Sequence, residues 1–197
     1  MVQPHRHSAA AGRYRARRFV LCAAAIVMAA GLAVADSTTR VDVSEANGVY
    51  RVAASFAVSQ SAEDVMAVLT NFERIPLYVP DMEISRVVER SADGMIVEQQ
   101  AVSKFMMFSR RVHLMLDVRT EGGAIKFRDR CKKSFASYEG AWLVSQHDSL
   151  TVIDYELSAK PAFEVPGFVL KRLLKRDAGL LVDRIKVEIA ARANRRQ

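Results

Sequence analysis

The chain has 197 residues, half of them hydrophobic, and its 29 basic and 22 acidic residues give a formal net charge of +7. Five arginines and no acidic residue lie within residues 1–18, so without this segment 24 basic residues face the 22 acidic ones. This near balance does not support nucleic-acid binding, and no nucleic-acid partner is predicted. The rest of the chain is long enough for one domain with a hydrophobic core, and we predict a monomer.

The N-terminus has the three parts of a secretory signal peptide. A basic stretch is followed by an apolar run and then by A-V-A at residues 33–35, a small-residue cleavage motif. We therefore predict a signal peptide over residues 1–35 that is cleaved after Ala35, export of the mature protein to the periplasm, and a polar tether over residues 36–39. The alternative is an uncleaved N-terminal segment that anchors the protein in the membrane.

The mature chain begins with the pattern of a β-hairpin. Strands are expected at residues 40–44 and 50–59, because apolar side chains occupy every second position of the longer stretch. Asn47 and Gly48 lie between the two stretches, and this dipeptide favours a tight hairpin turn.

A short helical region is expected next. Ser61, with Asp64 three residues later, is a variant of the capping box and predicts a helix that ends near Leu69. Pro76 and Pro80 then interrupt any further helix.

The second half of the chain predicts a series of strands and one long helix. Turn-forming residues separate six strand candidates, at residues 84–90, 95–103, 111–119, 124–130, 133–144 and 150–158. After a loop that contains Pro161 and Pro166, apolar residues recur every three or four positions from Gly167 to about Ala193, which predicts one amphipathic helix. We therefore expect a single domain over residues 40–193 and a basic tail over residues 194–197.

A long amphipathic helix must bury its apolar stripe against a large partner. The antiparallel strands are the only partner of that size in this sequence, so the predicted fold class is α+β. We expect a curved antiparallel sheet that wraps around the C-terminal helix, with short helices after the first strands. A cavity is expected between the sheet and the helix.

Three stretches also resemble a known family. They are S-A-E-D-V-M-A-V-L-T-N-F-E-R-I-P-L-Y-V-P-D-M (61–82), S-F-A-S-Y-E-G-A-W (134–142) and P-G-F-V-L-K-R-L-L-K-R-D (166–177). Their order and spacing resemble the SRPBCC superfamily of START-like, Bet v-like helix-grip domains, and within it the polyketide cyclase/dehydrase and coenzyme Q-binding START-like branch. The resemblance extends over residues 40–193. It implies a helix-grip fold and a deep pocket for a lipid, quinone, sterol or polyketide, while members of the superfamily share a cavity rather than one chemistry.

The resemblance and the alternation of the strands together suggest which side chains line this pocket. The candidates are inward-facing residues of the expected strands and apolar residues of the long helix. They are Phe56, Val97, Leu114, Leu116, Phe127, Tyr138, Trp142, Tyr155, Leu174, Ala178 and Leu181.

Few residues could carry catalysis. Glu139 is a weak candidate for a general base, and the alternative is a solvent-facing carboxylate paired with a basic residue. His113 and His147 have no second ligand at metal-binding spacing, so neither a metal site nor a cofactor is predicted. Cys131 lies in D-R-C-K-K, whose cations would lower the pKa of an exposed thiol, but we interpret it as a packing residue.

Two groups of residues suggest a portal or a contact with a membrane. The first is the apolar tetrapeptide Phe105, Met106, Met107 and Phe108, which lies between two expected strands and is flanked by basic residues. It is either a hairpin tip at a lipid surface or a continuation of the strands with both faces covered. The second is a basic patch on the long helix, either a solvated face or a contact with anionic headgroups; its residues are Lys171, Arg172, Lys175 and Arg176.

These observations favour an exported, non-enzymatic protein that holds or shuttles a hydrophobic small molecule or lipid. A peripheral membrane contact is a further prediction. The alternatives are a polyketide cyclase/dehydrase-like enzyme that acts on a ligand in the same pocket, and an interaction module whose core is filled.

Overall fold

The computed structural model describes residues 39–105 and 108–195. The predicted signal peptide at residues 1–35, the segment 36–38, Met106 and Met107 lie outside this part, so export and cleavage stay predictions. The described elements, in chain order, are β1 (Arg40–Ala46), β2 (Val49–Val58), α1 (Ala62–Leu69), the short 3-10 helix η1 (Phe72–Arg74), α2 (Ile75–Tyr78), β3 (Met82–Ser91), β4 (Gly94–Phe105), β5 (Phe108–Glu121), β6 (Ala124–Asp129), β7 (Phe135–His147), β8 (Leu150–Pro161) and α3 (Gly167–Asn194).

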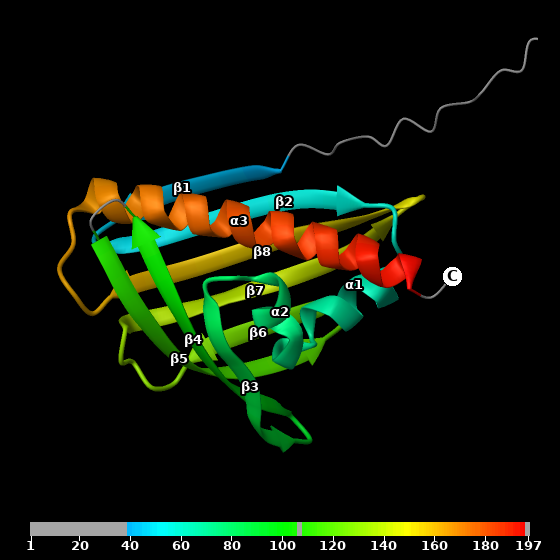
Figure 1. Ribbon diagram of the computed structural model, residues 1–197, viewed down its shortest axis with the longest axis horizontal. Helices are drawn as coiled ribbons and strands as arrows, with labels where there is room; N and C mark the ends of the chain where they lie inside the picture. The colour runs from blue at the N-terminus through cyan, green and yellow to red at the C-terminus, as the bar shows by residue number, and fades with distance from the viewer. Residues whose placement is uncertain (1–38, 106–107, 196–197) are drawn as a thin grey trace, which may run out of the picture. The chain divides into compact units, whose positions relative to one another are not determined.

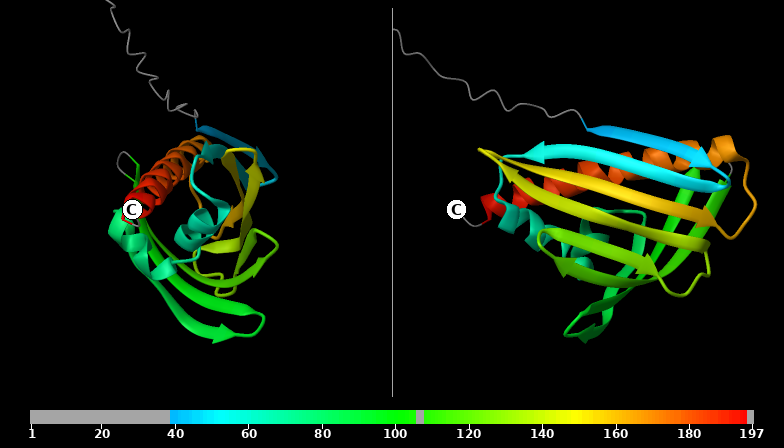
Figure 2. Two further views of the ribbon diagram at one scale, coloured as in Figure 1. Left: turned by 90° about the vertical axis from the view of Figure 1, so that its right-hand side faces the viewer. Right: turned by 180° about the vertical axis from the view of Figure 1, so that it is seen from behind.

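The eight strands of the described residues form one antiparallel sheet in the order β1-β2-β8-β7-β6-β5-β4-β3. The sheet is a meander from β3 to β8, and the first hairpin joins it because β2 pairs with β8. Figure 1 shows α3 lying across one face of the sheet, and Figure 2 shows the strands curving around it. The predicted fold class, a curved antiparallel sheet around a long C-terminal helix, is confirmed.

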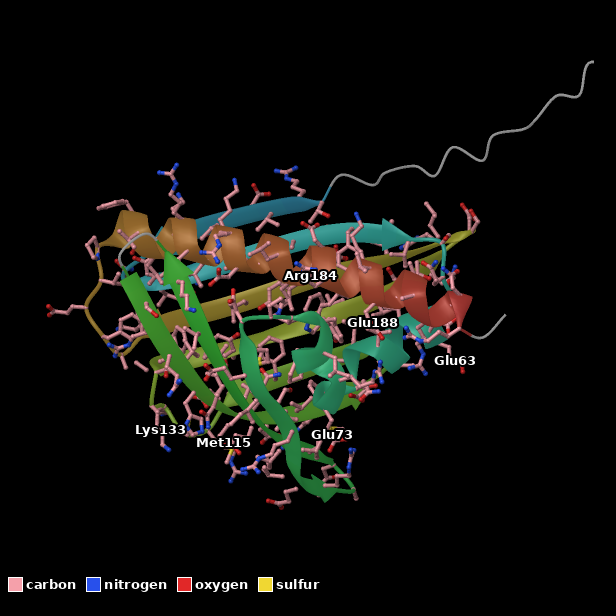
Figure 3. All side chains as sticks on the ribbon, viewed as in Figure 1. Glu63, Glu73, Met115, Lys133, Arg184 and Glu188 are labelled. Carbon is pink, nitrogen blue, oxygen red and sulfur yellow. The ribbon has the colours of Figure 1, made fainter. Side chains whose placement is uncertain are left out.

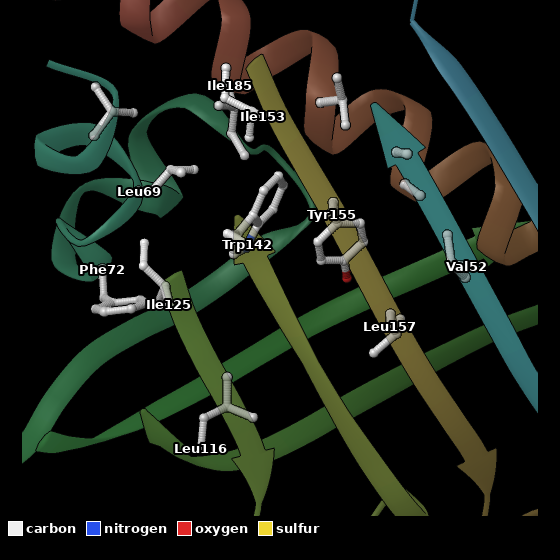
Figure 4. Packing of buried hydrophobic residues seen from close by; sticks show 14 of the residues in the cluster. Val52, Leu69, Phe72, Leu116, Ile125, Trp142, Ile153, Tyr155, Leu157 and Ile185 are labelled. Carbon is white, nitrogen blue, oxygen red and sulfur yellow. The ribbon is translucent and has the colours of Figure 1, made fainter. Parts of the chain in front are cut away.

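Alternation along the strands determines which side chains reach the core. In β2, Tyr50, Val52, Ala54 and Phe56 are buried, while the residues between them are exposed. The core continues on the other strands and on α3, where Trp142 of β7 and Tyr155 of β8 lie with ring centroids 4.3 Å apart (Figure 4).

The short helices close one end of the sheet. Ser61 caps α1 as predicted, because its hydroxyl accepts a hydrogen bond from the backbone N–H of Asp64 at 3.1 Å. Arg74 of η1 lies 3.7 Å from Glu188 of α3, which links this region to the long helix. Glu188 is labelled on α3 in Figure 3. Among the described residues, none of the helices combines the length and the apolar character that a bilayer crossing requires.

The β6–β7 connection differs from the prediction. The strand expected from residue 133 begins only at Phe135, because the chain first makes a tight turn in which Lys132 has a positive φ of 52°. The buried carboxylate of Asp129 holds this turn. It accepts hydrogen bonds from the backbone N–H groups of Met115 at 2.9 Å, Cys131 at 3.2 Å and Lys132 at 2.8 Å.

Replacing Asp129 by alanine should therefore destabilise the fold. Three backbone N–H groups would lose their buried acceptor, which we expect to lower the free energy of unfolding by about 3 kcal/mol. Urea denaturation measures this change. Asp93→Ala, in an exposed turn between β3 and β4, is the matched control and should change stability by less than about 0.5 kcal/mol. A loss below about 1 kcal/mol for Asp129→Ala would show that water replaces the carboxylate without cost.

Candidate ligand cavity

A cavity of about 310 Å³ lies between the sheet and α3. Its walls come from β2, the start of β3, β4, β5, β7, β8, α3 and the loop between β8 and α3. Most of the lining is apolar, and the volume falls within the range typical of small-molecule sites. The α3 residues of the lining run from Val169 to Leu181, so the cavity lies beside the first half of the helix.

The structure distributes the predicted pocket residues over three places. Six line the main cavity: Leu114, Tyr138, Tyr155, Leu174, Ala178 and Leu181. Leu116, Phe127 and Trp142 line a smaller adjoining cavity of about 120 Å³, which shares Tyr138, Tyr155 and Leu181 with the first. Phe56 and Val97 belong to the packed core and to the lining of neither cavity. Contact of any of these residues with a ligand stays a prediction.

Several lining residues were missing from the sequence-based set. Gln99, Ala101 and Ser103 of β4 line the cavity, and they follow Val97 at every second position. Arg110 and Val112 precede Leu114 on β5 in the same way. The period-two rule could have found them, but polar side chains at three of these positions obscured the apolar pattern.

Two tyrosines provide neutral polar groups inside the cavity. Tyr138 and Tyr155 both line the cavity, and their side chains lie near enough to affect each other's pKa. Burial raises the pKa of Tyr138 to about 12 and the pKa of Tyr155 well above its ordinary value. Both hydroxyls are therefore protonated at neutral pH and can donate or accept hydrogen bonds, while neither supplies a phenolate.

Asp177 is an acidic group in the cavity wall. It lies on α3 between Leu174 and Leu181, and the hydroxyl of Ser103 donates a hydrogen bond to its Oδ2 atom. Burial raises the pKa of Asp177, the nearby Asp81 carboxylate adds to this, and Ser103 and Arg176 oppose it. Because the helical stripe places Asp177 on the cavity side, the carboxylate faces the space that a ligand would occupy.

The raised pKa of Asp177 gives the stability a pH dependence. The folded state keeps this proton to a higher pH than the unfolded state, so the contribution of Asp177 to stability falls as pH rises above the ordinary aspartate range. We expect Asp177→Asn to be more stable than the unmutated protein at neutral pH, and the two to converge in acid. Urea denaturation of both proteins across this range tests it. A variant that is less stable at neutral pH would contradict the sign.

The cavity lining reaches the surface near the beginning of α3. Arg110 and Glu164 are exposed there, and the guanidinium carbon of Arg110 lies 4.3 Å from the ring centroid of Phe163. Phe168, in the first turn of α3, is 73% exposed. Such an apolar side chain in water next to a cavity rim marks a surface that can contact a hydrophobic partner.

The basic patch predicted on the long helix lies at this same end of the domain, near the beginning of α3. Lys171, Arg172 and Lys175 are exposed, whereas Arg176 is half-buried and donates a hydrogen bond to the backbone oxygen of Lys104. Phe105 and Phe108 pair in the register of β4 and β5. Met106, Met107 and the side chains of Phe105 and Phe108 lie outside the described part of the chain, so their portal role stays a prediction.

The structure places Glu139, the weak candidate for a general base, outside the lining of the cavity. Glu139 alternates with Tyr138 along β7, so its side chain points to the opposite face of the sheet. There it is exposed and pairs with Arg128 at 2.9 Å. This position matches the alternative that the sequence left open, a solvent-facing carboxylate paired with a basic residue.

The other chemically active residues also lie outside the cavity lining. His113 points to the face opposite Leu114, 3.5 Å from Glu98. Burial, together with the Asp129 carboxylate, raises the pKa of the Cys131 thiol, which is the reverse of activation. Within residues 39–105 and 108–195, no three potential metal-ligating side chains form a cluster.

The sheet, the long helix and the cavity between them define a START-like helix-grip domain. A sequence profile described as polyketide cyclase/dehydrase and lipid transport matches residues 58–186, and the chain belongs to this family of the SRPBCC superfamily. No curated protein matches the chain. The comparison thus assigns a family without assigning a ligand.

Solved structures share the fold at low sequence identity. A START superfamily protein from Mycobacterium smegmatis has a TM-score of 0.63 and 16% identity, over 72% of this chain and 97% of that one. The Zhui aromatase/cyclase from Streptomyces sp. R1128 has a TM-score of 0.62 and 14% identity, over 74% and 96%. A STAR-related lipid transfer protein from Xanthomonas axonopodis has a TM-score of 0.60 and 11% identity, over 77% and 98%.

Proposed function

We propose that this protein is a non-enzymatic carrier that holds one hydrophobic small molecule or lipid in the 310 Å³ cavity. The observation that carries the proposal is a largely apolar cavity between the sheet and α3 in a family that binds hydrophobic ligands. Burial of apolar ligand surface supplies the affinity, at about 25 cal/mol per Å² before ordering costs. Sterols, quinones, fatty chains and polyketide-like molecules all belong to this chemical class.

A cyclase or dehydrase acting on a ligand in the same cavity is the second candidate. One observation favours it: Asp177 lines the cavity and has a raised pKa, as a general acid or base requires. Among the described residues, however, the cavity lining contains no histidine or cysteine, and its other carboxylate, Glu164, is exposed at the rim. A carrier needs only an apolar lining and no set of catalytic groups, so it explains this cavity with fewer assumptions than an enzyme.

We further propose that the protein is exported, with residues 1–35 as its signal peptide, and that it delivers its cargo at an anionic membrane. Exposed Phe168 beside Lys171, Arg172 and Lys175 supports the docking. An apolar side chain ringed by cations suits the interface between headgroups and acyl chains. This surface adjoins the rim of the cavity, so a docked carrier would present its opening to the lipid.

Native mass spectrometry of the protein purified from its own host, combined with extraction and identification of lipids, tests the carrier proposal. The expected result is one apolar adduct per chain. A mass that corresponds to the chain alone, unchanged after incubation with lipid and quinone mixtures, would contradict a carrier and favour an interaction module.

Removing two cations from α3 should weaken docking on anionic membranes. Each basic residue near such a surface contributes about 1 kcal/mol, so Lys171→Ala with Lys175→Ala should lower binding to phosphatidylglycerol vesicles by about thirtyfold. Vesicle sedimentation measures the partition coefficient, and phosphatidylcholine vesicles should bind neither protein strongly. The control pair Arg90→Ala with Lys126→Ala removes two exposed cations from other surfaces. Equal losses for the two pairs would indicate nonspecific attraction rather than docking at this site.

A further inference from the structure

Asp177 lies where the main cavity meets a second hollow. This hollow, of about 320 Å³, is bordered by the segment before β3, by β4 and by α3, with Arg184 on its α3 side (Figure 3). Met82, Ala101, Ser103, Asp177 and Leu181 line both spaces. Among the residues that line both the main cavity and the second hollow, Asp177 and Ser103 are therefore polar, and the others are apolar.

The Asp177 carboxylate has hydrogen-bonding capacity that the protein leaves unused. Ser103 donates to Oδ2, whereas Oδ1 accepts no hydrogen bond from any described residue. The Nε atom of Arg176 lies 3.8 Å from Oδ1, beyond hydrogen-bonding distance. A carboxylate has about four acceptor positions, so one hydroxyl leaves most of them free.

Arg176 is also committed elsewhere. Its guanidinium donates to the backbone oxygen of Lys104 and lies 3.7 Å from the carboxylate of Asp81. The Oδ1 atom of Asp177 is buried, whereas the side chain as a whole stays 35% accessible, so a donor in the cavity contacts the accessible part of the carboxylate and reaches Oδ1 once the side chain rotates. A buried acceptor without a donor is costly, and a ligand that brings a donor relieves that cost.

The charged groups around Asp177 indicate which kind of ligand headgroup could carry this donor. Asp81 lies close enough to raise the pKa of Asp177 further, so an anionic headgroup would meet two carboxylates. Arg176 already holds the position next to both carboxylates, so a cationic headgroup would meet like charge. A neutral hydroxyl can donate to the carboxylate without either repulsion.

We propose that Asp177 is the polar anchor of the cargo, and that the cargo is an elongated apolar alcohol whose hydroxyl donates a hydrogen bond to the Asp177 carboxylate. The apolar body then lies along the wall formed by Leu114, Leu174 and Tyr155. Ser103 orients the carboxylate by its own hydrogen bond. This inference rests on the carrier function and narrows its ligand class to neutral alcohols, against fatty acids, phospholipids and hydrocarbons.

A competition between two isomers tests the anchor. Dodecan-1-ol and 1-methoxyundecane have the same atoms and similar length, but only the alcohol carries a donor. The delipidated protein is incubated with an equimolar mixture, separated from free compound by gel filtration and extracted, and the two isomers are quantified by gas chromatography. A hydrogen bond to a charged acceptor predicts that the alcohol is retained over the ether by about ten to one or more.

Two variants test whether Asp177 causes the preference for the alcohol over the ether. Asp177→Leu should reduce the ratio of alcohol to ether to about one to one, because the acceptor is removed while the cavity stays apolar. Asp183→Leu, an exposed aspartate of the same helix, should keep the ratio of the unmutated protein. A preference that persists in Asp177→Leu would overturn the anchor.

The two proposals fail differently in this experiment. Retention of both isomers in equal amounts by the unmutated protein would overturn the anchor and leave the carrier function intact. Retention of neither isomer would overturn both. The comparison on the unmutated protein does not depend on whether any variant folds.

Discussion

Replacing Ala178 by tryptophan is expected to abolish ligand binding while the protein still folds. Ala178 is only 7% exposed and faces the main cavity from α3. An indole at this position occupies the space that the cargo needs, so the Kd of a hydrophobic ligand should rise by at least about a hundredfold. In a packed core, replacing alanine by tryptophan would lower the free energy of unfolding by about 1–3 kcal/mol. At position 178 the ring instead enters a cavity and buries apolar surface.

Two measurements on Ala178→Trp separate these effects. Retention of dodecan-1-ol after gel filtration reports binding, and urea denaturation reports stability, which should change by less than about 1 kcal/mol. Val187→Trp is the matched control, since Val187 lies on the same helix and is 64% exposed. Normal binding by Ala178→Trp would place the cargo outside this cavity and contradict the carrier site.

Replacing Gly140 by alanine is expected to lower the free energy of unfolding by about 3 kcal/mol, at the upper end of overpacking effects. Gly140 lies in β7 between Tyr138 and Trp142, and it pairs with Phe127 of β6. A Cβ atom there would lie 2.2 Å from the backbone oxygen of Glu156 and 2.6 Å from the ring of Phe127. The backbone contact is the more severe, because a strand cannot move aside as a side chain can.

Gly179→Ala provides a control of opposite sign. Gly179 lies inside α3, and a Cβ atom at this position would meet nothing within 4 Å. Alanine should therefore stabilise the helix by about 0.5–1 kcal/mol, because it reduces the conformational entropy of the unfolded chain. Thermal and urea denaturation of both variants measure the contrast. Equal stabilities would contradict the close approach of β7, β6 and β8 at Gly140.

The sequence was sufficient for the fold because the fold depends on local periodicity. The period-two alternation of β2 and the three- and four-residue spacing of α3 each identify a buried face, and two buried faces of this size must pack together. The same alternation also accounts for the position of Glu139. Since Glu139 alternates with Tyr138, it could not share the inner face.

Asp177 shows a signal that was present and not used. It follows Leu174 by three positions and precedes Leu181 by four, so it belongs to the apolar stripe of α3 despite its charge. A lone acid on such a stripe breaks the local pattern, and such exceptions are expected at functional sites. Restricting the candidate lining to apolar residues left it out.

The sequence by itself determined the order of the elements, which of their faces are buried, and the family to which the chain belongs. The family in turn indicated a fold that binds ligands. Only the tertiary structure decided that Ser103 donates to Asp177, 74 residues away, and that Phe56 packs in the core while Ala178 faces an open space. Periodicity states which side of an element faces inward. Whether that interior is filled depends on the curvature of the whole sheet and the summed volumes of side chains distant in the chain, which no local pattern contains.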